Sequence, residues 1–442
     1  EESAKSITLN CGEGVQLNES TATEIIIALP PVKFTNGFSV IITSTEGGKQ
    51  TIETDMENEV LRSSLLKMPA VIFEPPVNLS ASGTANSYIV SDAGTYRFTP
   101  TKGNSAESVG TISSVAVLWE SFGTSTAPSD GDLINNVTYS NGSINFKATA
   151  NKGNAVIAAK DADGKILWSW HIWLTDQPQA QVYNNNAGTM MDRNLGATSA
   201  TAGDVGALGL LYQWGRKDPF PGSKLYSWSG TNDESSAFST DYTYYTVANS
   251  GYGWKYESGV GLTVAEAIAQ PMFRCQNATA ADPDPSCADG SKNFNNVTRP
   301  WVAGMCAVEY SQLWVDDQKS NYDPCPAGYR VPTQAQVKAD FSDLTSQFTT
   351  SGKTNGLTLS SVNCWLPAAG YRTYDGNGKL FKVGTMGHYW TSTAYFPRSS
   401  NHHYGATFYT MAIRETTSGV YGITSNGQLK ASETAAVRCV KE

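Results

Sequence analysis

Aromatic rings gather with small polar residues in two stretches of this chain, and that combination suits recognition of sugars or proteins. Rings give rigid apolar contact at low entropic cost, while Ser, Thr, Asn and Gly adapt their hydrogen bonds to a ligand. The ligand-binding candidates in the first stretch are Trp228, Tyr242, Tyr244, Tyr245, Trp254 and Tyr256. Those in the second stretch are Tyr395, Arg398, His402, His403 and Tyr404. For the first stretch, rings packed inside a loop core are an equally good interpretation.

Patterns for metal binding and catalysis are weak by comparison. His402 and His403 are adjacent, so on a strand they point to opposite faces, and the sequence offers no third ligand. Asp282 and Asp284 are spaced like Ca²⁺ ligands, but the prolines beside them favour a solvated loop. The chain has no GxSxG elbow, Walker loop or GxGxxG turn. We therefore expect no metal, no cofactor and no enzymatic activity.

Seven cysteines are present, and six of them fall in the C-terminal half of the chain. No CxxC pair or histidine partner indicates zinc, so disulfides formed in an oxidising compartment are the preferred interpretation. One expected bridge joins Cys275 to Cys287 and closes a loop. Reduced, buried thiols are the alternative. The disulfide candidates are Cys275, Cys287, Cys306, Cys325, Cys364 and Cys439.

Opposite charges are concentrated inside two otherwise apolar segments. Asp192 and Arg193 lie in MMDRNLGA, and Arg216 and Asp218 lie in LYQWGRKDP. One interpretation makes them a site that grips a ligand. The favoured one is that they form buried ion pairs and hydrogen bonds that hold loops in place. The same interpretation applies to Trp365, Arg372 and Trp390.

Composition limits the class of protein. The 442 residues include 16% charged and 11% aromatic side chains, a profile typical of a loop-rich secreted β protein with two or three domains. A formal charge of −9 without clustered Lys and Arg argues against nucleic-acid binding. No apolar run has the length of a transmembrane helix. The sequence begins at Glu1 without a signal peptide, so we expect that a leader was removed or lies outside this chain.

The first half of the chain has the alternation and the glycine turns of β-hairpins. A turn is predicted at Glu46-Gly47-Gly48, and Pro75-Pro76 predicts a linker because consecutive prolines cannot continue a strand ladder. Strands before this linker are predicted at Ile25–Leu29, Phe38–Thr43, Gln50–Thr54 and Ala70–Phe73. Strands after it are predicted at Thr95–Thr99, Val115–Glu120, Ile144–Ala148, Val156–Lys160 and Lys165–Leu174.

The strand predicted at 165–174 has apolar residues on both sides. Period-two alternation places Ile166, Trp168, Trp170, Ile172 and Leu174 on one face. Leu167, Ser169, His171 and Trp173 then share the other face. We therefore expect both faces to be covered. The short strands between 81 and 176 favour a small immunoglobulin-like sandwich.

Helices are predicted at only two places in the last 260 or so residues. Thr263 with Glu266, and Thr333 with Gln336, each fit the capping box, in which the two side chains satisfy the first amides of a helix. The remainder is expected to be loop and strand.

Six short phrases of the C-terminal region resemble, in this order, the Fibrobacter succinogenes major paralogous domain. That family occurs on bacterial surface proteins and is similar to the C-type-lectin-like and formylglycine-generating-enzyme folds. The resemblance implies an α+β C-type-lectin-like domain, and a Cys325–Cys439 disulfide beside strands of its central sheet. The phrases are MMDRNLGA (190–197), LYQWGRKDP (211–219), CPAGYRVPT (325–333), WLPAAGYR (365–372), YWTSTA (389–394) and VRCVK (437–441).

Two activities of the related folds lack their residues in this chain. Formylglycine-generating enzymes are similar at GYRVPTQAQV, YWTSTA and VRCV, but they hold copper with a cysteine pair, and Cys439 is the only cysteine after Cys364. Calcium-dependent lectins carry a Glu-Pro-Asn or Gln-Pro-Asp phrase and a Trp-Asn-Asp phrase, and neither occurs here. An enzyme on the formylglycine-type scaffold is thus the least favoured class.

Residues 1–76 resemble the rear part of the N-terminal domain of Bacteroidales fimbrillins, through ALPPVKFTNGFSVIITSTEGGK and LRSSLLKMPAVIFEP. Fimbrillins are lipoproteins assembled into pili by β-strand donation, which exploits an open sheet edge. A complete domain of that family is nearly twice as long, so the resemblance is partial. It implies pilus subunits as partners.

These observations predict mainly β N-terminal units, fimbrillin-like at 1–76 and an immunoglobulin-like sandwich at 77–178, followed by an α+β C-type-lectin-like domain at 179–442. The expected function is a cell-surface or pilus-tip adhesin, extracellular or on the outer membrane, that binds a glycan or a host surface protein. The alternative is a structural component of the envelope or pilus that binds no ligand.

Overall fold

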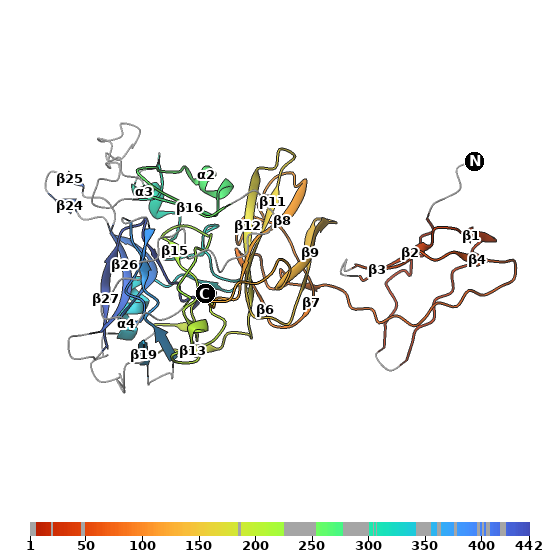
Figure 1. Ribbon diagram of the computed structural model, residues 1–442, viewed down its shortest axis with the longest axis horizontal. Coiled ribbons are helices and arrows are strands. Elements are labelled where there is room, and N and C mark those ends of the chain that lie inside the picture. The colour runs from red at the N-terminus through yellow and green to blue at the C-terminus, as the bar shows by residue number, and fades with distance from the viewer. Residues whose placement is uncertain are drawn as a thin grey trace. The chain divides into compact units, whose positions relative to one another are not determined.

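The computed structural model describes residues 6–18, 21–45, 49–183, 187–224, 253–276, 300–303, 305, 307–341, 355–359, 364–374, 378–395, 398–399, 402–403, 407–415 and 421–442. Strands predominate in this part of the chain and the helices are few and short, so the prediction of a β-rich fold is confirmed (Figure 1). The chain divides into two compact units, Glu1–Asn78 and Leu79–Glu442.

The N-terminal unit contains two small antiparallel sheets. β1 (Val32–Phe34) pairs with β4 (Asn58–Val60), and β2 (Phe38–Thr43) pairs with β3 (Lys49–Thr54). The strands predicted at 38–43 and 50–54 are therefore confirmed. Those predicted at 25–29 and 70–73 are wrong, because these segments have no regular secondary structure and a strand needs a neighbour for its hydrogen bonds. The turn predicted at 46–48 lies outside the described residues, and β5 (Val77–Asn78) ends the unit.

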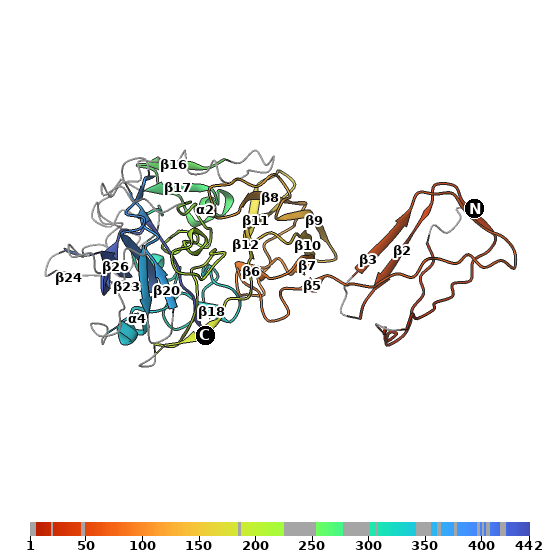
Figure 2. The ribbon, with the colours of Figure 1, turned by 60° about the horizontal axis from the view of Figure 1, so that its bottom comes forward.

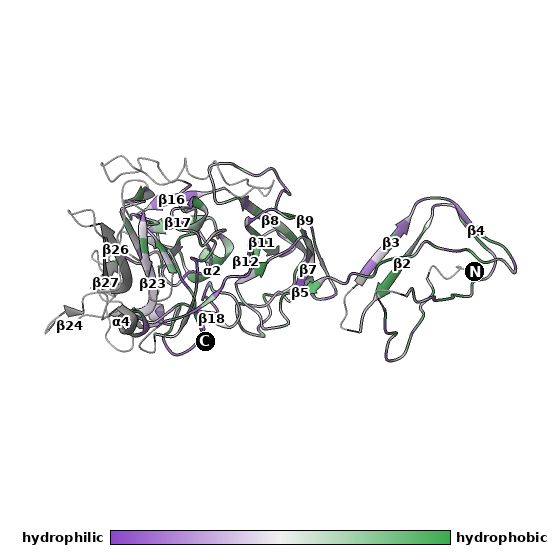
Figure 3. Cartoon of the chain, turned by 90° about the horizontal axis from the view of Figure 1, so that it is seen from below, coloured by the Kyte–Doolittle hydropathy of each residue, from purple (hydrophilic) through white to green (hydrophobic). Residues whose placement is uncertain are grey.

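This unit has strands but no interior. None of its described residues is buried, and large apolar side chains are exposed along it, including Ile26 at 70% and Ile72 at 77%. Figure 3 marks both hydrophobic and hydrophilic stretches along its trace. β2 alternates half-buried and exposed side chains, the pattern of a strand with one face to cover. Two-stranded sheets are marginally stable in water without such cover. The described residues of this unit thus form paired strands without a buried core.

The C-terminal unit begins with two facing sheets. One has the strand order β6-β12-β11-β8, in which β6 runs parallel to β12, and the other contains β7, β10 and β9 in that order. Phe98 of β7 contacts Trp170 of β12 with ring centroids 5.3 Å apart, so the core lies between the sheets. The strands are β6 (Ser87–Val90), β7 (Gly94–Phe98), β8 (Ser114–Ser121), β9 (Ile134–Ser140), β10 (Ser143–Ala148), β11 (Gly153–Lys160) and β12 (Ile166–Leu174).

β12 is covered on both faces, as its sequence predicts. Trp168, Trp170 and Ile172 lie in the core between the sheets, and Trp173 lies in the core on the other side. The pairing with β11 shifts register between Ala159 and Lys160. This irregularity interrupts the alternation, so Ile166 joins Trp173 instead of Trp168, and the face predicted for Ile166 is wrong.

Residues 179–442 pack on that second face of the sheet (Figure 2). Trp119 and Trp173 of the sheet share one apolar cluster with Trp214, Trp301 and Trp390 of the C-terminal region. From residue 79 onward, the predicted segments 77–178 and 179–442 therefore meet through a common core within a single compact unit.

In the described residues of 179–442, strands form three sheets and three isolated pairs. The sheets have the orders β13-β14-β29-β18, β15-β28-β21-β22 and β23-β26-β27, and the pairs are β16-β17, β19-β20 and β24-β25. Their bounds are β13 (Ala180–Val182), β14 (Thr189–Met191), β15 (Tyr212–Gln213), β16 (Lys255–Ser258), β17 (Phe273–Gln276), β18 (Tyr329–Arg330), β19 (Gly356–Leu359), β20 (Cys364–Pro367), β21 (Tyr371–Arg372), β22 (Leu380–Phe381), β23 (Met386–Tyr395), β24 (Arg398–Ser399), β25 (His402–His403), β26 (Thr407–Glu415), β27 (Tyr421–Leu429), β28 (Thr434–Ala435) and β29 (Val440–Lys441).

The helical elements are short, and both predicted capping boxes are confirmed. Thr263 and Glu266 exchange backbone hydrogen bonds at the start of α2. Thr333 and Gln336 do the same at α4, with distances of 2.9 and 3.1 Å. The elements are the 3-10 turn η1 (Val205–Ala207) and the helices α2 (Val264–Ala269), α3 (Ala307–Ser311) and α4 (Gln334–Phe341).

Candidate functional site

Two rings of the first predicted ligand-binding group, Trp254 and Tyr256, lie in the described residues, and neither is an exposed surface ring. Trp254 is only 9% exposed and packs against Trp119 and Phe220, with ring centroids 5.6 and 6.4 Å away. Its prediction as an exposed binding ring is therefore wrong, and the loop-core interpretation holds for it. Tyr256 is half-buried, and its hydroxyl donates to the Tyr374 carbonyl. Trp228, Tyr242, Tyr244 and Tyr245 lie outside the described residues.

The second predicted group follows the long strand β23. Tyr395 is the last residue of β23, opposite Thr407 of β26. The backbones of β24 and β25 pair in an antiparallel register that places Arg398 opposite His403 and Ser399 opposite His402. Three of the five candidates are thus brought to one strand pair by the fold. Tyr404 lies outside the described residues.

The cysteine predictions divide into one confirmed bridge and two errors. Cys325 and Cys439 form a disulfide across 114 residues, with Cα atoms 5.9 Å apart. It joins the segments that lead into β18 and β29, which pair with each other. Cys275 and Cys364 are free, buried thiols, so the predicted Cys275–Cys287 bridge and the disulfide prediction for Cys364 are wrong. Cys287 and Cys306 lie outside the described residues.

The two free thiols have different surroundings. The Cys275 thiol on β17 donates to the Trp301 carbonyl at 3.2 Å, and burial raises its pKa to about 11. Cys364 on β20 also accepts hydrogen bonds, from Arg438 Nη1 at 2.7 Å and from the Tyr183 hydroxyl at 3.2 Å, and its thiol donates to the Asp192 carbonyl at 3.7 Å. Burial, followed by the proximity of Cys364, raises the pKa of Tyr183 well above its ordinary value, so this hydroxyl remains a donor.

Charged residues of the two predicted phrases have structural partners. Arg193 contacts Asp192 at 2.9 Å and Asp176 at 2.8 Å, and this guanidinium holds the pKa of Asp176 well below its usual range. Lys217 and Asp218 form a buried pair at 2.6 Å, and both contact Ser169 of β12. These contacts connect two loops of the C-terminal region to β12 and to the residues that follow it, which confirms the structural interpretation.

Arg216, Trp214 and Trp390 also donate hydrogen bonds to backbone carbonyls. Arg216 is fully buried and donates to the carbonyls of Phe273, Ala267 and Gln270. The Trp214 indole donates to the Thr391 carbonyl at 2.8 Å, and the Trp390 indole donates to the Tyr212 carbonyl at 2.6 Å. Buried side chains thus replace the regular ladders that this loop-rich region lacks.

A narrow recess lies where the end of β8 and the start of β11 meet loops of the C-terminal region. It is lined by several glycines and by the side chains of Ser121, Thr124, Asn154, Ser223 and Lys224. The cavity volume is about 10 Å³, roughly the space that one water molecule needs. A second cavity of about 10 Å³ lies among Tyr183, Tyr389, Trp390 and Arg438. Neither is large enough to enclose a sugar ring.

The part of the chain that the structure describes has no cluster of three or more His, Cys, Asp or Glu side chains suited to a metal ion. It also has no helix that is long and apolar enough to cross a membrane. No protein-family model matches the sequence, and no curated protein or solved structure is significantly similar to the chain.

The exposed apolar surface of the N-terminal unit was not predicted from the sequence. The exposed apolar side chains of the N-terminal unit include Ile25, Ile26, Ile27, Ile41, Leu65 and Ile72. The run Ile25–Ile27 indicates an apolar segment. A sequence pattern can predict a strand there, but it does not show whether another segment covers the side chains. The contact between Arg438 and Cys364 could not be predicted from a local sequence pattern, because 74 residues separate the two.

Proposed function

We propose that this protein is a cell-surface or pilus-tip adhesin of a Bacteroidales-type bacterium, and that its N-terminal unit is completed by a partner subunit. The observation that carries the proposal is the N-terminal unit itself, which has paired strands and no buried residue in its described part. A partner strand would satisfy open backbone groups and cover apolar side chains at once. The partial resemblance of 1–76 to fimbrillins supports this assembly mode.

In this proposal the C-terminal unit is the part displayed to the outside. Its first two sheets support an immunoglobulin-like assignment, since β8-β11-β12 and β7-β10-β9 correspond to the orders C-F-G and B-E-D of that sandwich. The remainder is proposed to be the C-type-lectin-like domain that binds a glycan or a host surface protein. A disulfide of 114-residue span supports an exported, extracellular location.

A photo-crosslinking experiment tests the assembly step. A benzophenone amino acid replaces Ile41, which is 59% exposed on β2, in cells that produce the whole protein. We expect a crosslinked adduct with a second polypeptide. The matched control is the same replacement at Tyr139, which is 40% exposed on β9, and no adduct is expected there. Absence of an adduct from position 41 would remove the assembly proposal.

A binding screen separates the adhesin from the structural alternative. Residues 79–442 and the whole chain are applied to arrays of glycans and matrix proteins. An adhesin predicts equal binding by both proteins, because the displayed unit is present in each. Silence of both would favour a structural component of the envelope or pilus, an alternative supported by the two cavities of about 10 Å³.

A further inference from the structure

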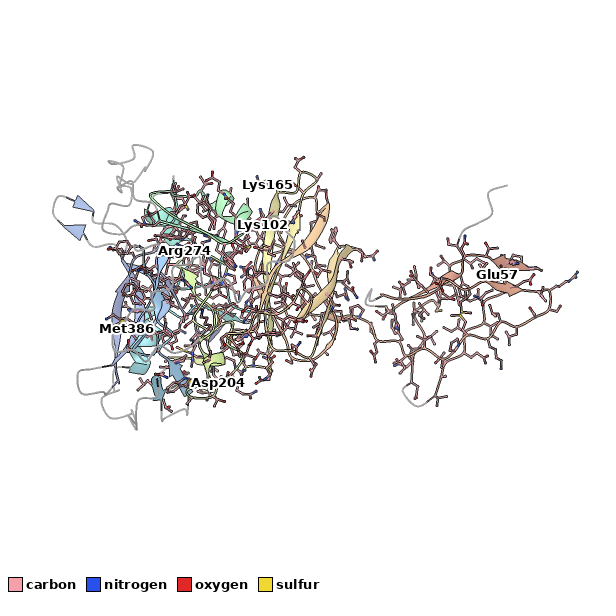
Figure 4. All side chains as sticks on the ribbon, in the orientation of Figure 1. Glu57, Lys102, Lys165, Asp204, Arg274 and Met386 are labelled. Carbon is pink, nitrogen blue, oxygen red and sulfur yellow. A yellow bond between two sulfur atoms is a disulfide. The ribbon has the colours of Figure 1, made fainter. Side chains whose placement is uncertain are left out.

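Arg274 on β17 is a buried cation with unused hydrogen-bond donors (labelled in Figure 4). Its Nη2 group donates to the Ser432 carbonyl at 2.9 Å and also contacts the carbonyls of Arg372 and Thr373. The Nε and Nη1 groups are equally buried and have no acceptor among the described residues. Within the described residues Arg274 forms no ion pair with a carboxylate.

Other unsatisfied polar groups belong to the segment that Arg274 contacts. The hydroxyls of Ser432 and Thr434 are both fully buried and lack hydrogen-bond partners within the described part of the chain. Ser432 supplies the carbonyl at 2.9 Å, and Thr434 on β28 pairs with Arg372 of β21. Buried polar groups are rarely left unsatisfied, so several on neighbouring segments point to an occupant such as water or an ion.

The positive charge of Arg274 determines whether water or an anion is the favoured occupant. Burial lowers the pKa of Arg274 to about 10, and the positive charge of Arg372 contributes to this shift while Tyr256 and Glu433 oppose it. The cation therefore lies in a place that disfavours positive charge. Glu433 is a nearby negative group, but no carboxylate of the described residues forms an ion pair with Arg274. A buried charge is stable only with a counter-charge and complete hydrogen bonding. A neutral water molecule supplies the second requirement but not the first.

Size restricts the counter-charge to a small ion. Arg274 has no exposed surface, and the Tyr256 ring centroid lies 4.9 Å from its guanidinium carbon. Gly378 covers Nη1 so closely that a Cβ atom there would lie 2.4 Å from it. We propose that Arg274, with the hydroxyls of Ser432 and Thr434, binds an inorganic anion of the size of chloride inside the C-terminal unit.

Anion-dependent thermal unfolding of the whole chain tests this proposal. Chloride is varied from 1 mM to 300 mM, with gluconate keeping the ionic strength constant. Because the anion binds the folded state, the unfolding midpoint should rise by about 2 °C for each tenfold increase above the dissociation constant. Bromide should act similarly. A midpoint that does not depend on the halide would overturn the proposal in favour of buried water.

Two variants and one crystallographic measurement complete the test. Arg274→Met should abolish the halide dependence, whereas Lys319→Met, which removes another buried cation, should lower the midpoint and keep the dependence. Equal dependence in both variants would place the anion elsewhere and refute the site. If Arg274→Met does not fold, crystals of the natural chain grown in bromide should show anomalous scattering within 3.5 Å or so of Arg274 Nε or Nη1. An empty position there would also refute it.

Discussion

The two units of this protein use similar β patterns with opposite results. β2 of the N-terminal unit and β12 of the C-terminal unit are both apolar strands with period-two alternation, yet β2 has no buried residue and β12 is covered on both faces. The difference is what surrounds each strand. β12 lies between a facing sheet and the C-terminal region, whereas β2 has one paired neighbour. Strand-forming sequence is therefore not sufficient for a core, which needs a second layer.

Separating the units is the most drastic test of this contrast. Residues 79–442 should unfold in one cooperative transition at the same temperature as in the whole chain, because their core involves no residue of 1–78. Residues 1–78 alone should show no cooperative transition. Differential scanning calorimetry of the three proteins measures both outcomes. A distinct transition of the isolated N-terminal unit would show that it has an interior of its own.

A pair of apolar substitutions makes the same comparison at single residues. Trp173→Ala opens a cavity in the core that joins β12 to the C-terminal region and should lower the free energy of unfolding by about 4 kcal/mol. Ile26→Ala removes a side chain that is 70% exposed and should change it by less than about 0.5 kcal/mol. Urea denaturation of both variants provides the measurement. Equal losses would mean that Ile26 is covered in solution.

The sequence predicts more of the β-strands than of the site. Alternation and capping boxes depend on neighbouring residues, so β12, α2 and α4 were predictable. Burial depends on which distant segment covers a residue. The polar neighbours of Trp254 left an exposed ring and a ring in a loop core equally favoured, and Trp119, from a strand more than 100 residues earlier, covers it. The Cys325–Cys439 bridge was predictable only through a family resemblance, since spacing alone allows many pairings.

The two buried thiols provide a comparison inside the C-terminal unit. Cys364→Ala leaves donors of Arg438 and Tyr183 without their acceptor and should lower the free energy of unfolding by about 3 kcal/mol. Cys275→Ala removes a sulfur of similar burial whose contacts with the Trp301 and Leu262 backbone involve no charged partner, and about 1 kcal/mol is expected. Chemical denaturation of the two variants measures the difference. A larger loss from Cys275→Ala would show that packing, and not hydrogen bonding, determines the effect of Cys364.

Acid should act on the C-terminal unit through its buried histidines. Burial lowers the pKa of His171 to about 3 and that of His388 to about 4, whereas both titrate near 6.5 when the chain unfolds. The unfolded state therefore binds protons first, and stability falls as the pH drops from about 6.5 toward these values. At pH 5 each histidine should cost about 2 kcal/mol relative to neutral pH.

His171 allows this acid effect to be assigned to one group. It lies on β12, where Nε2 donates to the Asn154 side chain at 2.9 Å and Nδ1 accepts from the Ser87 hydroxyl at 3.0 Å. His171→Gln removes the titrating group while keeping polar atoms at the site, so the loss of about 2 kcal/mol that His171 contributes between pH 7 and pH 5 should disappear. Unfolding of both proteins across that range provides the measurement. An unchanged pH dependence would mean that His171 is protonated in the folded state or reaches solvent.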